Sequence, residues 1–172
     1  MTASQVAEAV KEKRVTAMEV LETTLARIQA RDSVLNAFTT VTAVRARQKA
    51  AEIDATIAAG GDPGPLAGAT FAVKNLIDIK GVSTLAGAKI NADLPPAARD
   101  ATLIERLDAA GAVLLGGLNM GEYAYDFTGE NSHYGPSRNP RANARMTGGS
   151  SGGSGARWRV DCARDRSGCS RR

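Results

Sequence analysis

The sequence predicts an α/β protein whose β-sheet is covered by helices on both faces. Two observations carry this prediction. Segments with helical spacing alternate along the chain with short apolar segments of strand composition, and a helical segment separates the two most apolar of these strands. A chain of 172 residues with 43% hydrophobic and 23% charged residues can bury the core of about one domain.

The first expected element is a helix over residues 17–31. Its apolar face is formed by residues at helical spacing, namely Val20, Leu21, Thr24, Leu25 and Ile28. Thr16 and Glu19 fit a capping box at the start of this helix. A segment of strand composition follows at 35–41, and a second long helix is expected over 43–61, where glycines end it.

The turn-rich stretch GDPGPLAG (61–68) leads into the predicted sheet. The stretch ATFAVKNLIDIKG (69–81) begins with five residues, 69–73, that have the composition of a buried strand leading into Lys74. The stretch ends at Gly81. Residues 100–112 are expected to be helical, and AVLLGG (112–117) is a further short buried strand. In this helix the residues expected to point inward are Leu103, Ile104 and Leu107.

The net charge of +4 comes from one end of the chain. Residues 157–172 hold six arginines and two aspartates, so residues 1–156 are neutral overall and their charge indicates no anionic partner. Both cysteines lie in the same segment, seven positions apart, which is a weak indication of a disulfide or a metal site. The N-terminus lacks the layout of a secretory signal and no long apolar stretch occurs, so a cytoplasmic protein is predicted.

Lys74 is a candidate for chemistry because of its place at the end of an apolar strand. Desolvation lowers the pKa of an ammonium group, and a lysine with a lowered pKa can act as a base. The alternative is that Lys74 lies at the exposed end of the strand and extends its charge into water. The lysine alone does not decide between the two.

The loop GGSSGGSG (148–155) has three interpretations. It could be a flexible linker, a cradle for a phosphate group, or a loop that holds a serine in a catalytic geometry. The phosphate interpretation is weakened because no lysine follows the loop, as it does in a P-loop.

Three blocks in this order, GPLAGATFAVKNLIDIKGVSTLAG, NMGEYAYDFTGENSHYGPSRNP and MTGGSSGGS, resemble the N-terminal part of the amidase signature family. The resemblance covers about residues 4–156 and is greatest to the branch that includes carboxybiuret hydrolases, with the A subunit of the tRNA-dependent amidotransferase as a more distant relative. It implies an incomplete amidase signature fold, with a mixed β-sheet covered by helices.

The resemblance also implies hydrolysis of a small carboxamide by a serine–cis-serine–lysine triad, with no cofactor and no metal. Lys74 matches the family lysine, and Ser150 matches the bridging serine, whose peptide bond with Gly149 is cis in the family. Thr128, Gly149 and Ser151 are the substrate-binding candidates.

The segment GEYAYDFTGEN would line the acyl pocket by the same resemblance, with Thr128 near the leaving group. An ordinary surface loop capped by Asp126 and Glu130 is the alternative. His133 is expected to be a loop histidine, because the family uses no histidine there.

The family pattern ends at Ala156. The resemblance implies a nucleophilic serine about two dozen residues after Ser150, and none stands at a matching position. We therefore expect residues 1–156 to be the N-terminal part of an amidase domain and 157–172 to be a non-family tail produced by a reading-frame shift. As written the chain is expected to be an inactive fragment, and the full-length protein could be a homodimer.

A second function from another class also fits the sequence. The arginine-rich tail, with Trp158, could make the chain a non-catalytic module that binds nucleic acid or another polyanion. Because no matching basic face is evident in residues 1–156, we expect no nucleic-acid partner.

Overall fold

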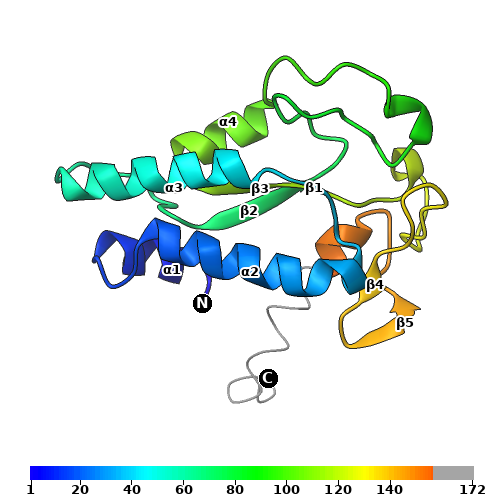
Figure 1. Cartoon of the computed structure of the whole chain (residues 1–172), viewed down its shortest axis with the longest axis horizontal. Helices are drawn as coiled ribbons and strands as arrows, with labels where there is room; N and C mark the ends of the chain where they lie inside the picture. The colour runs from blue at the N-terminus through cyan, green and yellow to red at the C-terminus, as the bar shows by residue number, and fades with distance from the viewer. Residues whose placement is uncertain (157–172) are drawn as a thin grey trace.

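A computed structural model of the chain describes residues 1–156 (Figure 1). The predictions of a frame-shifted tail and of an arginine-rich binding segment therefore lie outside the described residues. The described helices are α1 (Ala3–Lys11), α2 (Ala17–Leu35), α3 (Ala43–Ala58) and α4 (Thr102–Ala109), with short 3₁₀ turns η1 (Lys89–Asn91) and η2 (Glu122–Ala124). The described strands are β1 (Phe38–Val41), β2 (Thr70–Lys74), β3 (Val113–Leu118), β4 (Arg138–Asn139) and β5 (Ala142–Met146).

The central sheet has three strands in the order β1-β3-β2. Strands β2 and β3 are parallel and α4 lies between them in the sequence, so they form the predicted strand–helix–strand unit. Strand β1 pairs antiparallel with β3, which makes the sheet mixed. The α/β class and the mixed sheet are both confirmed.

Helices cover the two faces of this sheet, and the strands run between α2 and α4 in Figure 1. Side chains of β3 alternate between the faces. Val113 and Leu115 pack with apolar residues of α1, α2 and α3, whereas Leu114 packs with Ile104 of α4. All six residues of β3 are buried, which explains why this strand reads as a continuous apolar run.

Helix α2 confirms the predicted capping box. The Thr16 side chain accepts a hydrogen bond from the Glu19 N–H, and the Glu19 side chain accepts one from the Thr16 N–H. The helix continues to Leu35 rather than ending near residue 31, and the strand after it is shorter than predicted. Helix α3 ends at Ala58, before the glycines.

The predicted inward position of Leu103 is wrong. Ile104 is fully buried, but Leu103 is 50% exposed. Helix α4 has only eight residues and rests on the sheet through one narrow side, and Leu103 lies about 100° around the helix from Ile104.

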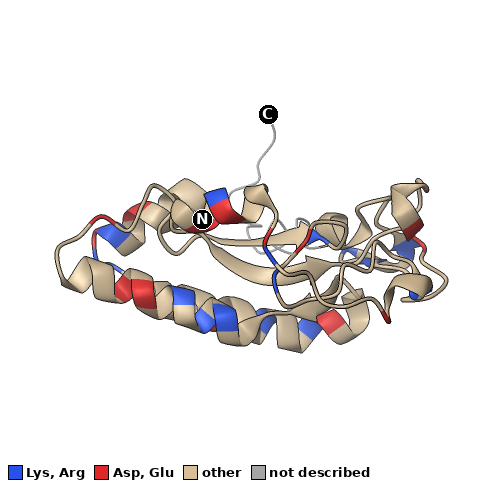
Figure 2. Cartoon of the chain, turned by 90° about the horizontal axis from the view of Figure 1, so that it is seen from above, with Lys and Arg blue, Asp and Glu red and all other residues tan. Residues whose placement is uncertain are grey.

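Charges of both signs are interspersed along the long helices (Figure 2). Between α3 and the start of α4, the Arg45 guanidinium donates two hydrogen bonds of 2.8 Å to the Asp100 carboxylate. Within residues 1–156, no helix is both long enough and apolar enough to cross a membrane.

Candidate active site

Lys74 and Ser150 are in direct contact. Lys74 is the last residue of β2, and its Nζ donates a hydrogen bond of 2.6 Å to Ser150 Oγ. Ser150 belongs to the glycine-rich loop that follows β5 and precedes a helical segment at 152–156. The structure thus brings together the two residues that the family resemblance implies as members of the triad.

The loop around Ser150 is fixed by backbone hydrogen bonds to two other segments. The Gly149 N–H donates to Phe127 O at 2.8 Å, and the Gly121 N–H donates to Ser150 O at 2.9 Å. The peptide bond between Gly149 and Ser150 is cis, as the resemblance implies. A loop held in this way does not fit a flexible linker, and the N–H of Gly149 is not free to bind a phosphate.

Gly149 must be a glycine because of the close approach of another loop. A Cβ atom at this position would overlap the backbone nitrogen of Gly129 and would lie 2.6 Å from Asp126 Oδ1. Thr128 and Gly149 are therefore neighbours in space, and Ser151 follows Gly149 two positions later on its loop. Of the substrate-binding candidates, Thr128 is exposed and Ser151 is half-buried.

Three buried asparagines hold the segments that surround this pair. Asn75 follows Lys74 directly, and its side chain donates to Thr39 Oγ1 and accepts from the Leu85 N–H. Asn119, at the end of β3, donates to the carbonyls of Asn36 and Gly135. Sequence reasoning missed these residues, although an asparagine directly after a buried strand is a signal that could have found two of them.

Asn131 has the same role in the acidic loop, which is the segment GEYAYDFTGEN at residues 121–131. Its side chain donates to the carbonyls of Gly87 and Met120 and accepts from the N–H groups of His133 and Tyr134. Each of these amides connects segments that lie far apart in sequence, so each satisfies backbone groups that the loops would otherwise leave unpaired.

The charge of Lys74 is affected by two opposing causes. Partial burial lowers its pKa, and the negative charge of Asp126 raises it, with burial the stronger. For Asp126, burial raises the pKa, but hydrogen bonds from Gly129 and Thr128 and the charge of Lys74 together lower it below its usual value. A lysine with a lowered pKa beside a hydroxyl is suited to accept a proton.

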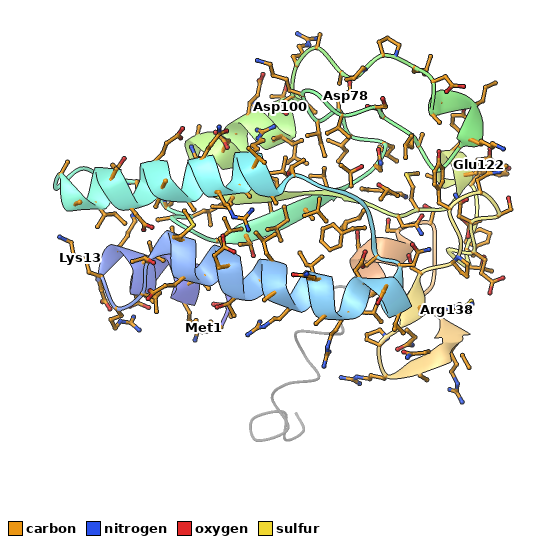
Figure 3. The ribbon with its side chains drawn as sticks, in the orientation of Figure 1. Met1, Lys13, Asp78, Asp100, Glu122 and Arg138 are labelled. Carbon is orange, nitrogen blue, oxygen red and sulfur yellow. The ribbon has the colours of Figure 1, made fainter. Side chains whose placement is uncertain are left out.

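The acidic loop forms the wall of a pocket of about 410 Å³. Its lining is provided by Glu122, Tyr123, Tyr125, Asp126, Glu130, Asn131 and Ser132. Figure 3 shows Glu122 at the loop-rich end of the molecule, opposite Lys13. Asp126 does cap the loop, because its Oδ1 accepts from the Thr128 N–H at 2.7 Å.

Among the described residues, His133 lies beside Glu122 and has no polar contact with Lys74 or Ser150. Its Nε2 lies 3.6 Å from Glu122 Oε1, and both side chains are partly exposed. In the part of the chain that the structure describes, no three His, Cys, Asp or Glu side chains are grouped to hold a metal ion.

A family model and several known proteins each match most of the chain. A family model described as Amidase matches residues 19–157. The chain is 57% identical over 156 residues to the AtzE subunit of 1-carboxybiuret hydrolase from Pseudomonas sp. (strain ADP), covering 91% of this chain and 34% of that protein. It is 46% identical over 148 residues to the A subunit of glutamyl-tRNA(Gln) amidotransferase from Koribacter versatilis (strain Ellin345), covering 86% and 31%.

Solved structures show the same similarity. One solved structure is that of a vestigial protein complex that reveals the evolutionary origins of an s-triazine catabolic enzyme. It matches this chain with a TM-score of 0.89 and 57% identity, covering 91% of this chain and 34% of that chain. A bacterial aryl acylamidase matches with a TM-score of 0.84 and 34% identity, covering 89% and 32%. The chain spans about a third of the length of the curated relatives it matches.

Proposed function

Because the chain belongs to the amidase signature family, we propose that Lys74 and Ser150 form the proton-accepting half of the active site of an amide hydrolase. The observation that carries the proposal is the hydrogen bond of 2.6 Å between Lys74 Nζ and Ser150 Oγ. Three features of the site support the proposal. Burial lowers the pKa of Lys74, backbone hydrogen bonds hold the loop around Ser150, and Gly149 leaves room for the loop that contains Gly129.

In the proposed mechanism the amine of Lys74 is neutral at the start. It takes the proton of the Ser150 hydroxyl while Ser150 takes the proton of a second serine, whose oxygen attacks the amide carbonyl carbon. The proton then passes through Ser150 to the nitrogen of the leaving amine as the C–N bond breaks, which leaves an acyl-serine ester and a neutral Lys74. Water next gives a proton to the same pair as its oxygen attacks the ester carbon, and that proton passes to the nucleophilic serine as the ester C–O bond breaks and the acid is released.

The nucleophilic serine lies outside the described residues in this proposal. The substrate is a small carboxamide, bound near Thr128, Gly149 and Ser151, and no metal or organic cofactor takes part. The relative with 57% identity is named for hydrolysis of 1-carboxybiuret, which makes a short, urea-like amide the first substrate to test.

For the full-length protein we propose a location in the cytoplasm and assembly as a homodimer. The frame-shift origin of residues 157–172 is tested by reading the DNA of the gene in all frames from the Ser150 codon onward. A frame that restores a family-like continuation is expected, and its absence would contradict this proposal.

The central test uses a chimera in which residues 1–156 precede the C-terminal two thirds of the 57% identical relative. We expect the chimera to hydrolyse 1-carboxybiuret, and Lys74→Ala and Ser150→Ala each to reduce kcat/KM by about 10³-fold or more. Lys89→Ala and Ser83→Ala are matched controls, since neither side chain contacts the pair. Near-normal rates in either site variant would overturn the assigned roles.

A further inference from the structure

Asp126 lies between Gly149, which precedes Ser150 in its loop, and Gly121, whose N–H donates to Ser150 O. A Cβ atom on Gly121 would overlap Asp126 Oδ2, and a Cβ atom on Gly149 would lie 2.6 Å from Asp126 Oδ1. The carboxylate therefore fills the space that side chains at both positions would need. Its Oδ2 is buried and has no hydrogen-bond partner among the described residues.

We propose that Asp126 is a positioning residue that holds Ser150 opposite Lys74. This inference rests on the proposed function, since a fixed Ser150 matters for proton transfer. Asp126 acts through the backbone around Ser150 and touches neither Ser150 Oγ nor Lys74 Nζ within hydrogen-bond distance among the contacts of the described residues.

Asp126 holds Gly149 in place through residues 127–129, which follow it in the sequence. Its Oδ1 accepts hydrogen bonds from the Thr128 N–H at 2.7 Å and from the Gly129 N–H at 2.5 Å. These bonds fold the chain back on itself and aim the Phe127 carbonyl at the Gly149 N–H. The residue before Ser150 is thereby held from one side.

Asp126 also holds Ser150 in place through Gly121. The Gly121 N–H donates to Ser150 O, and the Asp126 carboxylate packs against its Cα. The peptide between Gly149 and Ser150 is therefore held at both ends by segments that Asp126 contacts. A smaller side chain at 126 would leave a void between the two glycines and remove the acceptor that shapes the loop.

Asp126 also acts on Lys74 through its negative charge, and this effect on the pKa of Lys74 can be measured. Asp126 is the charged group that acts on Lys74 in the described residues, and it favours the protonated amine. Replacement by asparagine keeps a carbonyl oxygen as acceptor for Thr128 and Gly129 but removes the charge. The two contributions of Asp126 can thus be separated by choice of variant.

The experiment compares Asp126→Asn and Asp126→Ala in the 172-residue chain. Hydrogen exchange followed by NMR reports the Gly121 and Gly149 amides, and competitive acetylation followed by mass spectrometry reports the pKa of Lys74. We expect roughly tenfold faster exchange of both amides in Asp126→Ala and a smaller increase in Asp126→Asn. We expect a lower pKa of Lys74 in Asp126→Asn, because a neighbouring negative charge has been removed.

Glu130→Gln is the matched control, because it removes a carboxylate from the same loop. It should leave the two amides and the pKa of Lys74 unchanged, and changes equal to those of Asp126→Asn would overturn the proposal. Unchanged exchange at Gly149 together with an unchanged pKa of Lys74 in Asp126→Asn would also overturn it. Should Asp126→Ala unfold, Asp126→Asn alone decides.

Both readouts are made without substrate. A failure of the proposal therefore leaves amide hydrolysis by the chimera untouched, and a failure of hydrolysis leaves these results standing.

Discussion

Lys74 Nζ and Ser150 Oγ are 2.6 Å apart, although 76 positions separate the two residues in the sequence. The lysine is placed by the end of β2, and the serine is placed by a loop that bonds to the segment after β3. Since β2 and β3 are parallel neighbours, their carboxyl ends lie at one edge of the sheet and bring the two residues together.

The pH dependence of amide hydrolysis should follow Lys74. In the proposed mechanism the neutral amine of Lys74 is the active form, so kcat/KM of the chimera should rise with pH as Lys74 loses its proton. Because burial lowers the pKa of Lys74 from its ordinary value of 10.5, the rise should occur at a pH below that value. A pH–rate profile checks this, with Lys89→Ala as control. Activity that falls as the amine becomes neutral would contradict the role.

Gly149→Ala should disrupt the site while leaving the fold intact. The added methyl group would overlap the Gly129 backbone nitrogen, so the loop at 127–129 must move and Ser150 with it. We expect a loss of about 10²-fold in kcat/KM of the chimera with an unchanged circular dichroism spectrum.

Gly155→Ala is the matched control for Gly149→Ala. Its Cβ would lie 3.3 Å from the nearest atom, Thr147 O, a contact that a small adjustment relieves. Equal losses in the two variants would show that the loop is sensitive to any added methyl group, and the specific explanation would then be wrong.

Ile104→Ala should destabilise the fold, because the side chain is fully buried between α4 and the sheet. We expect a loss of about 2–5 kcal/mol in the free energy of unfolding, measured by urea denaturation of the 172-residue chain. Leu103→Ala is the neighbouring control and should cost about 0.5 kcal/mol or less, since half of Leu103 is exposed. Similar costs at the two positions would contradict the described packing of α4.

A fluorophosphonate probe should not label Ser150. The proposed role of Ser150 is to pass a proton to Lys74, and the attacking oxygen belongs to another serine. Mass spectrometry of the chimera should therefore place the label in the part contributed by the relative. A label on Ser150 would make that residue the nucleophile and reverse the assignment.

The sequence predicted two parts of the fold from local patterns. Helix α2 was predicted from its helical spacing and its capping box, and strand β3 was predicted from its continuous apolar run. Helix α1 was missed, although Thr2 and Gln5 form a capping box that could have revealed it. The hairpin of β4 and β5 was missed because β4 has only two residues, and because β5 is largely exposed and alternates through small alanines that give a weak strand signal.

The site was predicted only in part for a physical reason. Lys74 and Ser150 stand out by residue type and by their neighbours in sequence. Asn119 and Asn131 act through contacts with distant backbone groups, and no local pattern specifies which carbonyl a buried side-chain amide will meet. Such contacts follow from tertiary structure.

The contact between Lys74 and Ser150 is complete within the described 156 residues, about a third of the relatives' length. In the proposed mechanism, both members of the proton-accepting pair therefore belong to one contiguous third of the protein. Sequence changes in the remaining two thirds can then reshape the rest of the substrate pocket without altering the contact between Lys74 and Ser150.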